Sequence, residues 1–256
     1  MATAQSEITS NLDINARNIQ QLIQRAAEAG ADIVHFPEGA LSGCVKTQIR
    51  DWNEFDWQDL EEQLSNIARL CGKLGIWAVI GSAHNEHNRH RPFNSLYIID
   101  DTGKLAKRYD KRYCSHSEIT DWYVAGISPI TIEVKGIKLG FALCIEIQFP
   151  EIFQEYEQLN VDCVLLSAYS ESPMFAIQAQ GHAACNNIWM SYSVPRNLSR
   201  AQASCMIAPD GNVLGTCENN KDDITLHEIN PNAPQWDIPC QKARPWRRKA
   251  RLGDIY

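Results

Sequence analysis

The 256-residue chain lacks several features that would assign a protein to a class at once. No apolar run approaches the roughly 18 residues that a membrane-spanning helix needs, so no membrane partner is expected. The N-terminus has neither the basic end nor the apolar centre of a signal peptide. The net charge of −7 argues against a general nucleic-acid-binding protein.

Familiar nucleotide-binding and serine-enzyme motifs are also missing. The sequence contains no G-x-S-x-G, no P-loop and no G-x-G-x-x-G, so serine hydrolases, NTPases and dinucleotide enzymes have no motif support. With 44% hydrophobic and 21% charged residues and no linker, the composition is typical of a globular protein. We predict a single domain over residues 1–256, with a basic tail at about 233–256.

The cysteines do not form the pattern of a disulfide scaffold or a zinc ribbon. They are odd in number and contain no C-x-x-C pair, so reduced thiols in a cytoplasmic protein fit them best. The nine positions are Cys44, Cys71, Cys114, Cys144, Cys163, Cys185, Cys205, Cys217 and Cys240.

Three histidines, His84, His87 and His90, recur at every third residue, a spacing that could indicate metal ligands. They lie in a polar segment rich in Asn, Glu and Arg, which favours a solvated loop. We predict no metal and no cofactor.

Hydrophobic periodicity predicts helices alternating with strands and hairpins. Several strands are apolar on both faces, as in 163–166, which predicts sheets that are covered on both sides. We expect two similar sheets, one from each half of the chain. Helices are predicted at about 13–30, 56–73, 150–159 and 173–187, and strands at 31–36, 76–80, 94–99, 105–111, 130–134, 137–143, 163–166, 188–194, 204–208, 213–216 and 224–229.

Three residues at strand ends carry groups suited to catalysis. Cys144 ends an apolar strand where the chain turns polar, although a cysteine in such a strand can also be a small core residue. Glu38 closes the first core strand, where partial burial would suit a general base; a helix cap or a salt bridge is the alternative. Lys111 also follows a strand, and its ammonium could stabilise an oxyanion or be an ordinary surface charge.

Taken in order, these stretches resemble the nitrilase superfamily of carbon–nitrogen hydrolases. Phe36-Pro-Glu38 is similar to its glutamate motif, Tyr109-Asp-Lys111 to its lysine motif, and Leu139-Gly-Phe-Ala-Leu-Cys144 to its cysteine motif. The separations, 111 − 38 = 73 and 144 − 111 = 33 residues, also match. The resemblance covers nearly the whole chain and implies an α/β fold, a four-layer αββα sandwich.

The resemblance also implies a mechanism. Cys144 would attack the carbonyl carbon of an amide, and Glu38 would act as general base and then general acid. Lys111 and the backbone N–H of Ile145 would hold the oxyanion. Glu118 is the candidate for a second active-site glutamate that positions substrate.

Two regions depart from the family pattern. Glu146 and Gln148 stand where many members have aspartate and arginine, and the segment around Tyr169 lacks the usual Asn-Pro start. Both regions are expected to border the pocket, so Glu146 and Tyr169 are candidate pocket residues. Glu118 and Glu146 could together hold a cationic amine on the substrate.

The leading hypothesis is a thiol-dependent hydrolase of a small, non-peptide amide or N-carbamoyl compound. A catalytically silent binding or scaffolding protein, an acyltransferase and a nitrilase are the alternatives. Members of the family commonly dimerise, so a homodimer or larger homo-oligomer is expected.

Overall fold

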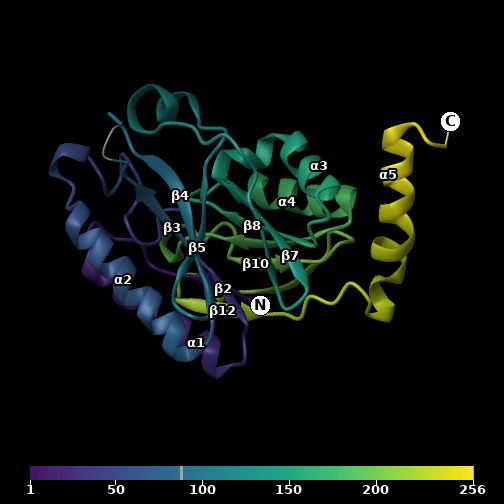
Figure 1. Ribbon diagram of the computed structural model, residues 1–256, viewed down its shortest axis with the longest axis horizontal. Coiled ribbons are helices and arrows are strands. Elements are labelled where there is room, and N and C mark those ends of the chain that lie inside the picture. Colours follow the sequence, from purple (N-terminus) through teal and green to yellow (C-terminus); the bar gives the residue numbers. More distant parts are fainter. Residues whose placement is uncertain (87–88, 256) are drawn as a thin grey trace.

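The computed structural model describes residues 1–86 and 89–255, which form two six-stranded sheets lying between helices (Figure 1). The first sheet has the order β12-β1-β2-β3-β4-β5, and the second has the order β11-β10-β9-β8-β7-β6. The strands of the first are β1 (Ala2–Gln5), β2 (Ile33–His35), β3 (Trp77–His84), β4 (Phe93–Ile99), β5 (Leu105–Asp110) and β12 (Asp223–Leu226). The strands of the second are β6 (Thr131–Val134), β7 (Ile137–Leu143), β8 (Cys163–Ser167), β9 (Trp189–Ser193), β10 (Cys205–Ile207) and β11 (Val213–Thr216).

Each sheet has its own pair of covering helices, and local sequence signals explain where they begin. The side chains of Asn11 and Asp56 accept hydrogen bonds from the first turns of two helices, and Pro150 and Pro173 occupy the first positions of the other two. These helices are α1 (Leu12–Glu28) and α2 (Trp57–Leu74) on the first sheet, and α3 (Pro150–Gln158) and α4 (Pro173–Asn186) on the second. Within residues 1–86 and 89–255, no helix is long and apolar enough to cross a membrane.

Alternating side chains along each strand build three separate cores. Val34 packs under α1 and α2, whereas its neighbour Ile33 packs between the two sheets. In the same way Val164 packs under α3 and α4, and Leu165 faces the other sheet. Three cores separate four layers, so the predicted αββα sandwich is confirmed.

A buried polar cluster aligns the two sheets near the end of β2. The imidazole of His35 lies 2.7 Å from Ser167 Oγ and 2.8 Å from Ser191 Oγ on the opposite sheet. Burial lowers the pKa of His35 to about 3, so the ring is neutral at ordinary pH. Ser167 Oγ also donates to the carbonyl of Phe36 at 2.8 Å, which fixes the segment that leads to Glu38.

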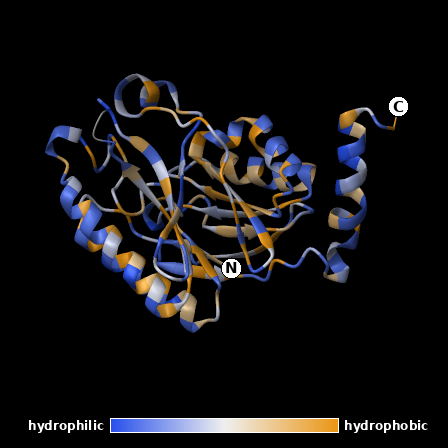
Figure 2. Cartoon of the chain, viewed as in Figure 1, coloured by the Kyte–Doolittle hydropathy of each residue, from blue (hydrophilic) through white to orange (hydrophobic). Residues whose placement is uncertain are grey.

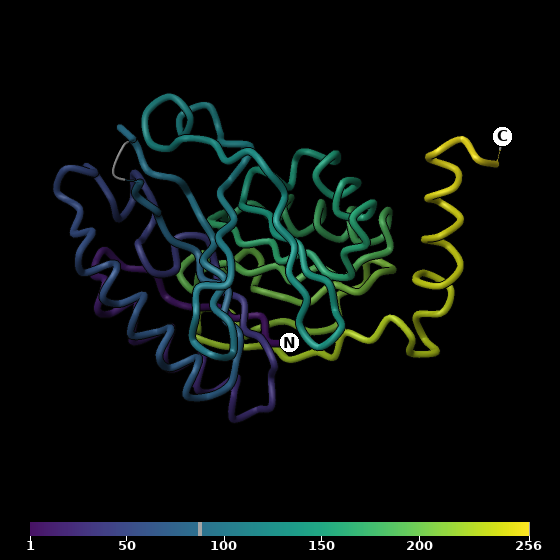
Figure 3. Tube along the Cα trace, viewed as in Figure 1, coloured from purple at the N-terminus to yellow at the C-terminus, as the bar shows by residue number. Residues whose placement is uncertain are grey.

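Two elements differ from the sequence-based expectation. β1 was not predicted; its four residues have little strand signal, but β1 lies between β2 and β12 and pairs with both. Figure 3 shows the N-terminus beside the chain segment that forms β12. No helix was predicted in the basic tail, yet the tail contains α5 (Arg244–Leu252).

The helix α5 escaped prediction because polar contacts, and not an apolar stripe, hold it. Figure 2 shows α5 as predominantly hydrophilic. Arg248 and Arg251 form ion pairs with the buried Glu157 of α3, at 2.7 and 3.2 Å. Arg247 donates to the carbonyl of Ala184 at the end of α4 at 2.7 Å. Hydrophobic periodicity cannot detect a helix attached in this way.

Candidate active site

The predicted glutamate, lysine and cysteine meet at one cavity between the ends of the sheets. Glu38 follows β2, Lys111 follows β5, and Cys144 follows β7. All three border a cavity of about 230 Å³. The sequence motifs, which are 73 and 33 residues apart, are therefore brought together at one cavity by the C-terminal ends of two strands of the first sheet and one strand of the second.

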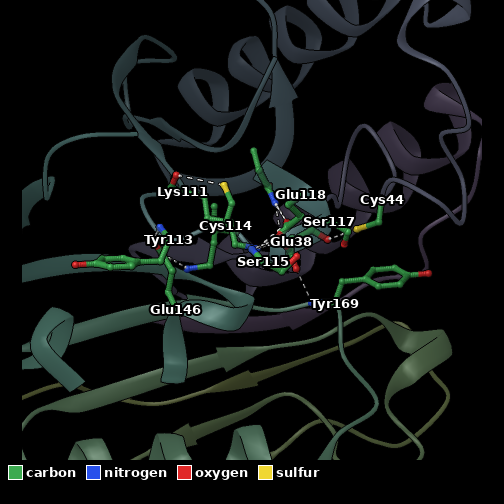
Figure 4. A network of polar contacts seen from close by, with 12 residues as sticks. Glu38, Cys44, Lys111, Tyr113, Cys114, Ser115, Ser117, Glu118, Glu146 and Tyr169 are labelled. Atoms are coloured by element: carbon green, nitrogen blue, oxygen red, sulfur yellow. Dashed lines mark hydrogen bonds and ion pairs between the residues drawn. The ribbon is translucent and has the colours of Figure 1, made fainter. Parts of the chain in front are cut away.

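The buried end of this cavity, which we call the cavity base, consists of Glu38, Asn94, Lys111 and Glu118 (Figure 4). Lys111 Nζ lies 3.2 Å from Glu38 Oε1, and 2.8 and 3.0 Å from the two oxygens of Glu118. Asn94 Nδ2 donates to the same Glu38 oxygen at 2.7 Å. The Lys111 side chain is only 1% exposed, so these contacts are shielded from water.

Charge pairing sets the protonation states at the cavity base. Burial alone would lower the pKa of Lys111, but the nearby charges of Glu38, Cys144 and Glu118 outweigh it and raise that pKa well above its usual value. Burial tends to raise the pKa of Glu118, yet the Lys111 ammonium and hydrogen bonds lower it overall. Lys111 is therefore a fixed cation and Glu118 a fixed anion at neutral pH.

Cys144 has the backbone geometry of a residue held for chemistry. Its φ of 51° lies in the left-handed region, which a residue with a Cβ adopts only at a cost of about 1 to 3 kcal/mol. This turn ends β7 and opens a short 3-10 helix, Cys144–Gln148. Burial and the Glu38 carboxylate raise the pKa of the Cys144 thiol, and Lys111 only partly opposes them. The resting thiol is therefore protonated and needs a base to become nucleophilic.

Close backbone approach holds Glu38 in place from both sides. On one side, a Cβ at Gly81 of β3 would lie 2.1 Å from the carbonyl oxygen of Pro37, so only glycine fits there. On the other side, the backbone N–H of Tyr169 donates to Glu38 Oε2 at 2.9 Å. The glutamate is thus oriented by both sheets.

Glu146 lies away from the cavity, contrary to the expectation that it borders the pocket. It is fully buried, and it accepts hydrogen bonds from the Tyr109 hydroxyl at 2.8 and 2.9 Å and from the backbone N–H of Arg112 at 2.7 Å. The N–H of Leu143 donates to its other oxygen at 2.7 Å. In Figure 4 it lies beside Tyr113, apart from Glu38 and Tyr169. Glu146 therefore joins the cysteine turn to the lysine segment and is not among the residues that border the cavity.

Gln148, the other departure from the family pattern, is exposed and also lies outside this cavity. Tyr169 and Ile145 do border it, as predicted. Gln48 Nε2 donates to the Tyr169 hydroxyl at 3.0 Å. Tyr169 thereby links the segment after β8 to the segment after Glu38.

Sequence reasoning missed several cavity residues. Asn94 is the second residue of β4 and looked like an ordinary strand residue, while Cys44, Lys46 and Tyr123 lie in loops without a motif. The only available signal for Asn94 was an amide at the start of an otherwise apolar strand. No signal pointed to the loop residues, because their positions depend on tertiary contacts.

Two of the three histidines, His84 and His90, lie within the described residues. His84 ends β3 and its Nδ1 lies 2.7 Å from the Tyr97 hydroxyl, while His90 is exposed. His87 lies outside the described residues. Within residues 1–86 and 89–255, no group of three or more His, Cys, Asp or Glu residues could hold a metal ion.

Comparison with known proteins finds relatives that are named as a nitrilase homologue and as amidases. Nitrilase homolog 2 of Dictyostelium discoideum is 22% identical over 91% of this chain and 76% of its own length. The omega-amidase of Bos taurus is 22% identical over 94% of each chain, and the 2-oxoglutaramate amidase of Bacillus subtilis is 25% identical over 54% of this chain and 52% of its own.

A solved structure and a family model agree with these relatives. A variant of the amidase from Nesterenkonia sp. AN1 in complex with butyramide has a TM-score of 0.81 and 18% identity, covering 100% of this chain and 95% of its own. At that identity the likeness shows the fold alone. Residues 1–236 match the family model described as carbon-nitrogen hydrolase. The chain therefore belongs to the carbon–nitrogen hydrolase family of the nitrilase superfamily.

Proposed function

We propose that this protein hydrolyses the C–N bond of a small, non-peptide amide or N-carbamoyl compound through a thioester on Cys144. The observation that carries the proposal is the Lys111 ammonium, held between Glu38 and Glu118 in a cavity that Cys144 borders. Cleavage of an amide needs a nucleophile, a base that later protonates the departing nitrogen, and a fixed cation that stabilises the oxyanion. A thiol, a carboxylate and an ammonium in one shielded site can supply these three functions.

The first half of the reaction forms the thioester. Glu38 accepts the thiol proton as Cys144 Sγ bonds to the carbonyl carbon, and the carbonyl electrons move onto oxygen. Lys111 Nζ and the backbone N–H of Ile145 stabilise this oxyanion. As the C–N bond breaks, Glu38 returns its proton to the nitrogen, which leaves as ammonia or an amine.

The second half releases the acid. Glu38 accepts a proton from a water molecule, whose oxygen bonds to the thioester carbon. The C–S bond then breaks, and Glu38 returns the proton to the Cys144 sulfur. Glu118 keeps Lys111 charged and oriented through both halves, because it contacts the ammonium with both oxygens.

The names of the relatives favour amides over nitriles. Formamidase, omega-amidase and 2-oxoglutaramate amidase are among them. The solved amidase of Nesterenkonia sp. AN1 is described with an acetamide moiety added covalently at its active-site cysteine. These names support a cysteine-dependent amidase as the proposal for this chain.

The test is ammonia release from a panel of amides, N-carbamoyl compounds and nitriles, run in parallel with Cys144→Ala. We expect ammonia from at least one amide or carbamoyl compound and none from the variant. Incorporation of one heavy oxygen from labelled water into the acid indicates hydrolysis, whereas a new amide formed with an added amine indicates acyl transfer. No turnover on any compound, with ligand binding retained, would instead favour a silent binding protein.

We also propose a homodimer or a larger homo-oligomer. Met174 and Ile177 of α4 are 53% and 57% exposed, and their spacing of three residues places them on one face of the helix, where a second copy could cover both. A sedimentation mass equal to one 28.9 kDa chain would contradict this assembly.

A further inference from the structure

One charged residue of the cavity has no part in the mechanism above. Lys46 borders the same cavity as Cys144 but is exposed, so it lies where the cavity opens to solvent. We call the segment 44–49, together with 115–117, the cavity mouth. Lys46 Nζ donates a hydrogen bond to Ser117 Oγ across this opening.

The charges around the cavity make Lys46 unlike the other ionised groups. Glu38 and Glu118 are both paired with Lys111. In contrast, among the residues that the structure describes, no carboxylate forms an ion pair with Lys46. The cavity therefore has an ammonium shared by two carboxylates at its base, and at its mouth an ammonium that is hydrogen-bonded to a neutral hydroxyl. An anion that enters the cavity can pair with Lys46 without displacing another carboxylate.

The backbone holds Lys46 in this position at a cost. Its φ is 69°, in the left-handed region that residues with a Cβ seldom adopt. The N–H of Lys46 donates to the carbonyl of Ile49 at 2.9 Å, and the N–H of Cys44 donates to the Gln48 side chain at 3.0 Å. A strained residue maintained by surrounding bonds at a site opening is an indication of function.

A second contact joins the residues that follow the two mouth segments and helps to hold those segments together. Trp52 Nε1 donates to the carbonyl of Trp122 at 3.0 Å, and the Trp52 ring stacks on Trp57 at 5.4 Å between ring centres. The Lys46–Ser117 bond joins the same two parts of the chain, as Figure 4 shows for Ser117 beside Cys44. Lys46 therefore borders the cavity from a braced loop.

We infer that Lys46 is a specificity residue that binds an anionic group at the far end of the substrate. The substrate class is a short monoamide of a dicarboxylic acid, with the amide at Cys144 and the carboxylate at Lys46. This inference rests on the proposed function and narrows its substrate. It replaces the expectation of a cationic substrate, because Glu118 is paired with Lys111 and Glu146 lies outside the cavity.

The experiment compares succinamate with butyramide, a neutral amide of similar length, and with an amide that carries a terminal ammonium. The wild-type protein is expected to have a kcat/KM at least roughly tenfold higher for succinamate than for butyramide. A hydrogen bond between two charged groups strengthens binding by about that factor. Lys46→Met should remove this preference by raising KM for succinamate, with a much smaller change in kcat and in butyramide hydrolysis. Lys46→Arg, which keeps the positive charge, should retain most of the preference for succinamate.

The matched control is Lys107→Met, which removes an exposed lysine of β5 outside the cavity lining and should change nothing. Butyramide turnover without a preference for succinamate, or a preference that survives Lys46→Met, would overturn the inference but leave the proposed function intact. If no amide is turned over, the proposed function fails. Binding of succinamate to Cys144→Ala, with and without Lys46→Met, then tests the inference by calorimetry: a weaker binding with Lys46→Met supports it, and equal binding overturns it.

Discussion

The base and the mouth of the cavity each contain a lysine, and the two lysines have opposite surroundings. Lys111 is 1% exposed and contacts two carboxylates, whereas Lys46 is exposed and contacts one serine hydroxyl. Removal of a buried, paired charge leaves its partner charges buried and uncompensated, which costs stability. Removal of an exposed charge costs little, because water solvates the groups that remain. The same residue type is therefore expected to serve catalysis at the base and recognition at the mouth.

The largest effect is expected from Lys111→Met. Without the ammonium, Glu38 and Glu118 face each other as like charges, so the free energy of unfolding should fall by about 3 to 5 kcal/mol. Loss of the oxyanion donor should lower kcat by about 1000-fold on any amide. Denaturant unfolding and butyramide kinetics measure the two effects.

The control for that variant is Lys46→Met at the mouth. Its free energy of unfolding should stay within about 0.5 kcal/mol of the wild type. If both lysine variants lose similar stability and similar butyramide activity, the distinction between base and mouth is wrong.

A second prediction concerns Glu38→Gln. This substitution should slow amide hydrolysis but speed alkylation of the Cys144 thiol. Hydrolysis should fall by about 100-fold to 10,000-fold, because the general base is lost. The negative charge of Glu38 raises the pKa of Cys144, so its removal lowers that pKa and increases the thiolate fraction at alkaline pH.

Alkylation of Cys144 by iodoacetamide at about pH 9 should therefore be faster in Glu38→Gln than in the wild type. Peptide mass spectrometry measures this rate, and Cys144→Ala provides the background from other cysteines. Slower alkylation of the variant would show that Glu38 activates the resting thiol and does not suppress its ionisation.

The smallest effect on catalysis is expected from Glu146→Gln. The amide cannot accept all the bonds that the carboxylate receives from Tyr109, Arg112 and Leu143, so the free energy of unfolding should fall by about 1 to 3 kcal/mol. Since Glu146 does not border the cavity, KM for succinamate should remain as in the wild type. A selective rise in KM for charged amides would return Glu146 to the substrate site.

The sequence predicted the cavity base far better than the mouth. Glu38, Lys111 and Cys144 each follow a strand, and strand patterns are visible in the order of apolar residues. Their convergence depends on the packing of the two sheets, because β2 and β5 belong to the first sheet and β7 belongs to the second. Asn94 escaped because its role depends on pairing between β4 and its neighbours.

The mouth could not be predicted for a different reason. Lys46 lies in a loop whose conformation depends on the bonds around Cys44 and on contact with Ser117, 71 residues further along the chain. Such long-range contacts leave no periodic signal. Glu146 was predicted to border the pocket, because it lies two residues after Cys144, but it does not. The turn at Cys144 directs its carboxylate toward the lysine segment instead.

The most direct test of this account is to stop the reaction with acid during turnover of succinamate and to weigh the intact protein and its peptides. The account predicts a transient adduct with the mass of the amide minus ammonia, on the peptide that contains Cys144, decaying at the rate of acid formation. Turnover without an adduct, or with an adduct on Cys44, which borders the same cavity, would contradict it.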